Sequence, residues 1–89
     1  MEEFSAEDRA TITVALKSYA EWLTKQRNQA ERDRRRLLRW AESERIGKQA
    51  RDSYVKQSED IGRYMDARNA RIDDVLSLVD RVSSEAVAA

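Results

Sequence analysis

A repeat of seven residues runs through almost the whole chain. If Ile12 is assigned to position d of a heptad labelled a to g, positions a and d are mostly apolar in two long stretches. Apolar residues at this spacing form one stripe along an α-helix, which must be buried against a partner helix. The apolar a and d residues are Ile12, Leu16, Tyr19, Leu23, Ala30, Leu37 and Trp40, then Tyr54, Ile61, Met65, Ile72, Val75, Val79 and Val82.

The ends of the two predicted helices carry recognisable signals. Ser5 followed by Asp8 is typical of a helix start, because a hydroxyl can cap a free N–H and acids favour the positive helix end. Gly47 is the best candidate for a helix end, because glycine adopts the left-handed conformation of a C-cap. We therefore expect helices at about 6–45 and 49–84, with residues 85–89 as a frayed tail.

The polar middle of the heptad pattern decides how the helices are arranged. In one continuous helix forming a parallel coiled coil, the charged a and d residues would each face their own copy, which is unfavourable. A reversal near Gly47 instead brings Glu44 close to Arg51 and Trp40 beside Tyr54. We favour this hairpin over the single helix, and over three helices with a break at Asn28. The charged core residues in question are Asp33, Glu44, Arg51 and Arg68.

Composition agrees with a small all-α domain that spans residues 1–89. Two glycines, no proline and 38% charged residues suit long helices. Without cysteine or histidine, no disulfide, thiolate metal site or histidine acid–base chemistry is available. We expect no enzyme activity, no metal and no cofactor. With no apolar leader and no long apolar run, we expect a cytoplasmic chain that does not enter a membrane.

Charge is unevenly distributed although the net charge is zero. Residues 1–24 carry −3, residues 25–56 carry +6 and residues 57–89 carry −3. A hairpin gathers the positive charge at the loop end and the negative charge at the terminal end. The densest basic segment is Arg32, Arg34, Arg35, Arg36 and Arg39, with the apolar residues Leu38 and Ile46 nearby.

This arginine cluster is the strongest functional signal in the sequence. Guanidinium groups suit carboxylates and phosphates, and arginine with neighbouring apolar groups is typical of protein-binding hot spots. We interpret the chain as a non-enzymatic protein-binding module, an adaptor or an inhibitor, that contacts an acidic partner surface. The alternatives are a nucleic-acid-binding regulator that uses the same arginines, a structural coiled-coil subunit, and a solvated helix face without a partner.

Apolar residues also lie beside the predicted seam. Ala15, Trp22, Tyr64 and Leu78 occupy position g, which falls on one flank of an antiparallel pair. A homodimer forming a four-helix bundle would bury them. The simpler alternative is that the rings of Trp22 and Tyr64 fold over the seam of a single hairpin.

A line of acidic residues marks the second predicted helix. Asp52, Glu59, Asp66, Asp73 and Asp80 all occupy position b. Heptad neighbours lie about 10 Å apart along a helix, which is too far for two carboxylates to share a metal ion. We interpret the line as a solubilising face, or as a contact for a basic surface such as the basic end of another copy.

Overall fold

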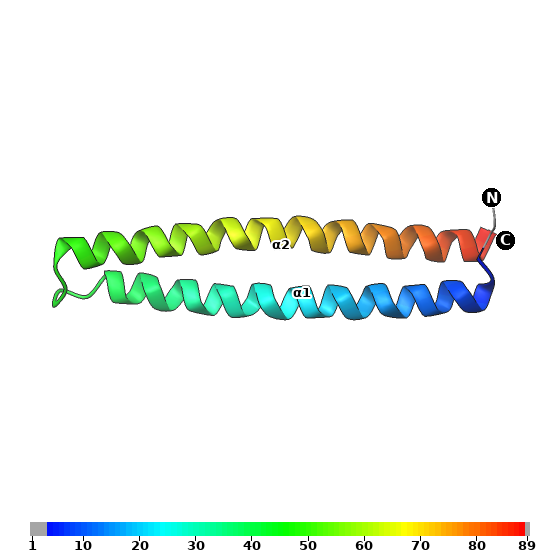
Figure 1. Cartoon of the computed structure of the whole chain (residues 1–89), viewed down its shortest axis with the longest axis horizontal. Helices are drawn as coiled ribbons and strands as arrows, with labels where there is room; N and C mark the ends of the chain where they lie inside the picture. The colour runs from blue at the N-terminus through cyan, green and yellow to red at the C-terminus, as the bar shows by residue number, and fades with distance from the viewer. Residues whose placement is uncertain (1–3, 89) are drawn as a thin grey trace.

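The protein is a rod made of two antiparallel helices. The computed structural model describes the backbone of residues 4–88 and the side chains of residues 4–84. Helix α1 (Ala6–Ala41, 36 residues) and helix α2 (Lys48–Ala88, 41 residues) lie side by side, joined at one end, with both termini at the other (Figure 1). The Cα atoms span 64 × 18 × 15 Å. The predicted all-α hairpin is confirmed, and α1 continues through Asn28 without a break.

Helix α1 begins where the sequence predicts. The hydroxyl of Ser5 accepts a hydrogen bond from the backbone N–H of Asp8 at 3.0 Å, and the carboxylate of Asp8 accepts one from the backbone N–H of Ser5 at 3.3 Å. This reciprocal pair is a capping box, which satisfies two backbone donors that a helix start leaves free.

The connection between the helices differs from the prediction. Helix α1 ends at Ala41 rather than near residue 45, and Glu42 caps it in the right-handed conformation. The Ser43 hydroxyl accepts a hydrogen bond from the backbone N–H of Arg45 at 3.3 Å, a local bond that competes with the helix. The expected left-handed Gly47 is wrong, because its φ is not positive. Its carbonyl instead accepts the backbone N–H of Arg51 as α2 begins.

Arg51 ties the end of α1 to the start of α2. Its Nε donates to the carbonyl oxygen of Ala41 at 2.9 Å, and a terminal nitrogen donates to the carbonyl of Ser43 at 3.3 Å. The last carbonyls of a helix lack intrahelical partners, so this guanidinium satisfies groups that the helix cannot. The expected approach of Glu44 to Arg51 produces no ion pair among the described residues, because Arg51 bonds to these backbone oxygens.

Arg51→Ala is therefore expected to lower the free energy of unfolding by about 1–2 kcal/mol, in the range of hydrogen bonds to a charged donor that is partly exposed. Urea unfolding followed by circular dichroism measures the loss. Arg45→Ala is the matched control, because Arg45 lies in the same connection with an exposed side chain. Equal losses from both variants would show that the Arg51 bonds do not hold the turn.

A narrow core lies between the helices. The buried apolar residues are Ala20, Leu23, Ala30, Ala41, Ile72, Val75 and Val79, and Leu16 and Tyr19 pack against them. Leu23 and Val75 are the largest fully buried side chains. Ser58 is also buried, and its hydroxyl donates to the carbonyl of Val55 at 2.6 Å, so no polar group is left without a partner there.

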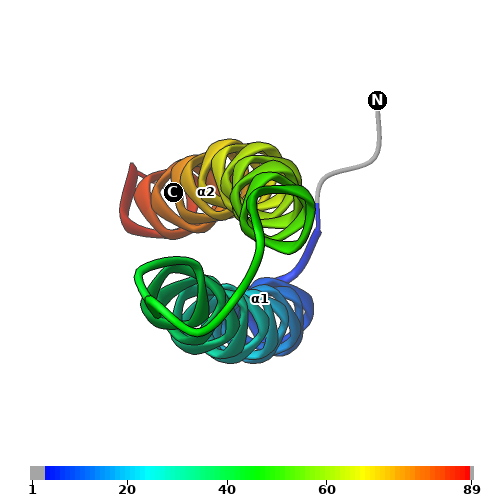
Figure 2. The same ribbon diagram turned by 90° about the vertical axis from the view of Figure 1, so that its left-hand side faces the viewer.

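The seam is not symmetric about positions a and d. Ala20 and Ala41, both at position e, are buried, whereas residues at position g are mostly exposed. Seen along the rod, the two helices stay together while their axes slant in opposite directions, as in a coiled coil (Figure 2). Burial therefore extends from the seam to the small alanines at position e, whereas the larger side chains at position g stay largely exposed.

The predicted tail lies largely outside the described side chains. Helix α2 continues to Ala88, beyond the expected end at residue 84. Residue 89 and the side chains from residue 85 onward fall outside the described part, so the fraying of 85–89 stays a prediction. Within the part of the chain that the structure covers, neither helix has a stretch long and apolar enough to cross a membrane.

Candidate functional site

Four arginines form one exposed face on the loop half of α1. At 100° per residue, Arg32, Arg35, Arg36 and Arg39 project within an arc of about 100°. Arg32, Arg35 and Arg39 lie on the side away from α2, and Arg36, at position g, lies at the edge toward the flank of Trp22 and Tyr64. All four are exposed. We call these four residues the arginine face. Arg34, the fifth predicted residue, is exposed as well but projects from the flank at position e, beside Leu38.

The positive charge of the arginine face is only partly balanced within α1. Arg35 forms an ion pair with Glu31 at 3.0 Å, but both side chains are largely solvent-exposed, so this pair contributes little. Arg32 donates to the amide oxygen of Gln29 at 2.7 Å. Among the described residues, Arg36 and Arg39 form no ion pair. Their guanidinium groups are therefore free to bind an external carboxylate or phosphate.

The apolar residues predicted beside the arginines are separated by the fold. Leu38 is 37% exposed and lies next to Arg35 on the helix surface. Ile46 is half-buried and lines a shallow pocket of about 270 Å³ at the end of the rod with Trp40, Ser43 and Tyr54. The ring centroids of Trp40 and Tyr54 are 5.6 Å apart, as the hairpin register predicted. Ile46 therefore belongs to the loop end and not to the arginine face.

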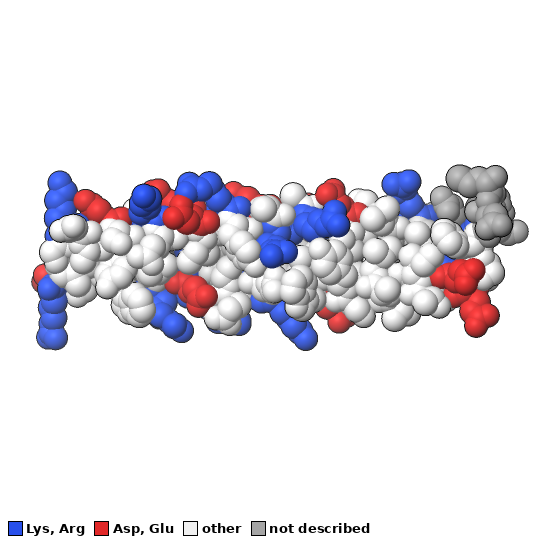
Figure 3. All heavy atoms as spheres, in the orientation of Figure 1, with Lys and Arg blue, Asp and Glu red and all other residues white. Residues whose placement is uncertain are grey.

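The predicted self-association residues all lie on the open flank. Trp22, Tyr64 and Leu78 are 49%, 39% and 40% exposed, and Ala15 is exposed as well. These four residues at position g are called the aromatic flank. On one face of the rod, uncharged side chains form a band along the junction of the helices, and a few basic side chains lie within this band (Figure 3).

Arginine stacking on the aromatic flank was not foreseen from the sequence. The guanidinium of Arg68 lies 4.9 Å from the ring centroid of Tyr64 and 5.8 Å from that of Trp22. Arg71 stacks in the same way on Tyr19, at 5.9 Å. Such cation–π contacts hold the rings in place while leaving part of each exposed. The sequence feature that indicates these contacts is the charged Arg68 at seam position d. A charged side chain at the seam must turn toward one flank to reach solvent.

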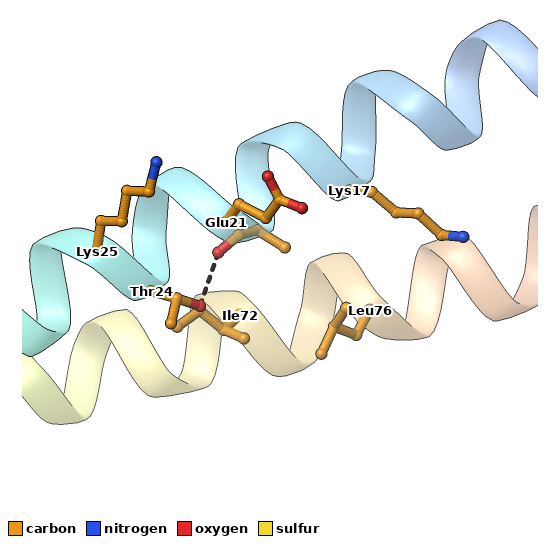
Figure 4. Close-up of a pocket in the computed structure, with 7 residues that line it drawn as sticks. Lys17, Glu21, Thr24, Lys25, Ile72 and Leu76 are labelled. Carbon is orange, nitrogen blue, oxygen red and sulfur yellow. Dashed lines mark hydrogen bonds between the residues drawn. The ribbon is translucent and has the colours of Figure 1, made fainter.

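An open groove on the opposite flank was also missed. It has a volume of about 520 Å³ and is floored by Ala20 and Ile72, with Leu76 beside them. Lys17, Glu21, Thr24 and Lys25 complete its lining. Figure 4 shows Ile72 and Leu76 on α2, which runs beside the segment of α1 in which the Thr24 hydroxyl donates to the carbonyl of Ala20 at 2.8 Å. The small Ala20 opposite Leu76 creates the space.

The acidic line on α2 is exposed along its length. Asp52, Glu59, Asp66, Asp73 and Asp80 all face solvent. Position b projects on the same side of the molecule as the groove, away from the aromatic flank. Within the described residues, no group of three potential ligands is placed to hold a metal ion. The rod thus carries acids on one flank, and aromatic rings with arginines on the other.

The fold and these surfaces define a small all-α helical hairpin with charged, partly apolar faces. In comparisons with known proteins, no protein-family model, curated protein or solved structure matches this chain. Its function must therefore be inferred from the surfaces described above.

Proposed function

We propose that this chain is a non-enzymatic protein-binding module, an adaptor or an inhibitor, whose arginine face contacts an acidic surface of another protein in the cytoplasm. The observation that carries the proposal is the exposure of Arg36 and Arg39, which pair with no carboxylate in the described part of the chain and lie within a segment of net charge +6. Leu38 adds apolar contact area beside the arginines. Charge reversal at Arg35 and Arg39 tests the proposal, because it replaces attraction to an acidic surface by repulsion.

Nucleic acid is the second candidate, and one observation favours it. Exposed rings of Trp22 and Tyr64 lie beside Arg68, and single-stranded nucleic acids bind to aromatic rings among basic residues. Two features favour a protein instead. The net charge is zero, and the acidic line of α2 repels a phosphate backbone.

We further propose that the module is a homodimer that buries the aromatic flank in a four-helix bundle. A monomer of 10.3 kDa is expected to expose about 5,350 Å², from the scaling of surface with mass, whereas this chain exposes 7018 Å². The rod shape of the chain leaves this excess of roughly 1,700 Å² exposed, which is enough to supply the ~800 Å² that each partner buries in a standard interface. A structural coiled-coil subunit would use the same contact to build a larger assembly.

Trp22→Ala is expected to weaken dimerisation at least 30-fold, because a buried aromatic hot spot contributes about 2 kcal/mol or more. Sedimentation equilibrium measures the dissociation constant, and circular dichroism checks that helix content is retained. Val14→Ala is the control, since Val14 is 64% exposed at position f, away from the aromatic flank. A wild-type chain that stays monomeric at high micromolar concentration would show that the rings belong to the single hairpin.

A further inference from the structure

We propose that the two hairpins of the dimer lie antiparallel, so that the loop end of one copy is beside the terminal end of the other. The occupant of the aromatic flank is thus a second copy of this chain, related by a two-fold axis at the level of Trp22. This inference rests on the self-association proposed above and specifies its geometry. The side chains on the flank indicate which surface meets, the distribution of charge indicates the orientation of the copies, and the position of Trp22 along α1 indicates where the two-fold axis lies.

The choice of flank follows from the exposed apolar side chains and from the charges beside them. In a two-fold dimer the same surface of both copies meets itself, so a surface lined by one sign of charge repels. The groove flank is bordered on α2 by the five exposed carboxylates of the acidic line, and Lys17 and Lys25 of α1 line the groove itself, so this flank is charged along its length. The aromatic flank exposes two large rings, Trp22 at 49% and Tyr64 at 39%, together with Leu78 at 40%. Its charged groups, Arg68 and Arg71, lie over aromatic rings of the same chain and do not form a continuous line.

The orientation follows from the axial separation of charge. Residues 25–56 carry +6 and occupy the loop half of the rod. Residues 57–71 lie in the same half and carry no net charge, whereas residues 4–23 and 72–84 occupy the terminal half and together carry −3, from three basic and six acidic residues. A parallel dimer places each half against its like, whereas an antiparallel dimer places the basic half of one copy against the acidic half of the other. Coulomb interaction therefore favours the antiparallel arrangement.

The position of the rings fits this arrangement. Trp22 lies 16 residues after the start of α1 at Ala6, about 24 Å along a helix of about 54 Å at 1.5 Å per residue. If the two Trp22 side chains are in contact, most of the length of one hairpin therefore lies beside the other hairpin. Tyr64 lies on the loop side of Trp22 and Leu78 on the terminal side, so the antiparallel axis brings Tyr64 of one copy toward Leu78 of the other.

The arrangement has a consequence for partner binding. Arg35, exposed at position f, is 13 residues from Trp22, which places it about 20 Å along the rod from the two-fold axis. The antiparallel dimer therefore presents two arginine faces at opposite ends, about 40 Å apart along the rod. Such a dimer binds two copies of an acidic partner, or bridges two sites on one partner. Bivalent engagement raises the overall affinity without new contacts at either site.

The experiment measures distances between nitroxide labels on identical positions of the two copies. The chain contains no cysteine, so one introduced cysteine is labelled uniquely. Glu42→Cys places the label at the loop end, 20 residues from Trp22, and Ser18→Cys places it four residues from Trp22. Both side chains are exposed. Double electron–electron resonance is recorded on each variant above the dissociation constant of the dimer, with dimer mass confirmed by light scattering.

The antiparallel dimer predicts about 60 Å between the Glu42 labels and a short distance, under about 30 Å, between the Ser18 labels. A parallel dimer gives short distances at both positions, which overturns the inference but retains the proposed self-association. Monomeric chains give no intermolecular distance at either position, which overturns both. Salt provides an independent readout: it weakens the antiparallel dimer and strengthens a parallel one, because it screens attraction in the first and repulsion in the second.

Discussion

Leu23→Ala is expected to lower the free energy of unfolding by about 2–5 kcal/mol, the usual cost of removing a fully buried leucine side chain. Leu23 is 0% exposed and packs with Ala20, Ile72 and Val75 in the core cluster. Small domains are stable by only a few kcal/mol. This one substitution is therefore expected to remove much of the stability of the hairpin. Urea unfolding at fixed protein concentration, followed by circular dichroism, gives the value.

The same substitution on the surface of α1 provides the control. Leu38→Ala removes the same atoms from a side chain that is 37% exposed, and its loss is expected to stay below about 1 kcal/mol, because little new cavity forms. Unfolding is measured at two protein concentrations, since dimerisation stabilises the folded state by mass action. Similar losses for Leu23→Ala and Leu38→Ala would mean that the seam of the hairpin is not its stabilising core.

The heptad pattern was sufficient to predict the hairpin and its register. The seven-residue spacing determines which side of each helix is apolar, and the charged seam residues disfavour a parallel pair. Trp40 meets Tyr54 as expected, and Leu23 and Ile72 share the core cluster. The turn was predicted less well. Its exact course depends on local bonds of Ser43 and Arg51 to the backbone, which the heptad pattern does not encode.

The surfaces were predicted only in part, because helical periodicity determines the direction of a side chain within a helix but not beyond its end or between two helices. Helical periodicity places Arg32, Arg35, Arg36 and Arg39 on one face, and the structure finds all four exposed there. Ile46 lies after the end of α1, where periodicity no longer determines direction, and it packs in the loop-end pocket instead. The groove beside Ala20 arises from the size difference between residues on two helices, which only the assembled pair reveals.

Combined charge reversal, Arg35→Glu with Arg39→Glu, is expected to abolish binding of the physiological partner and leave helix content unchanged. Both side chains are exposed, so the fold does not depend on them. Placing Glu at position 35 beside Glu31 costs only a few tenths of a kcal/mol within the helix. At an acidic partner surface, however, each substitution replaces attraction by repulsion. Electrostatic steering then fails, so the association rate falls, and the difference from wild type shrinks as salt rises.

The matched control reverses two exposed charges on α2, Lys56→Glu with Arg63→Glu. Both positions are exposed f residues, and Arg63 pairs with Asp60 much as Arg35 pairs with Glu31. The two double variants have the same net charge of −4, so a general charge effect would weaken both equally. Each is immobilised and exposed to native lysate with and without nuclease treatment, and bound proteins and nucleic acid are quantified against wild type. Loss of a specific protein with the α1 variant alone supports the proposal. Equal binding by the α1 variant and wild type would show that the arginine face is merely solvated, whereas binding that nuclease removes would identify nucleic acid as the partner.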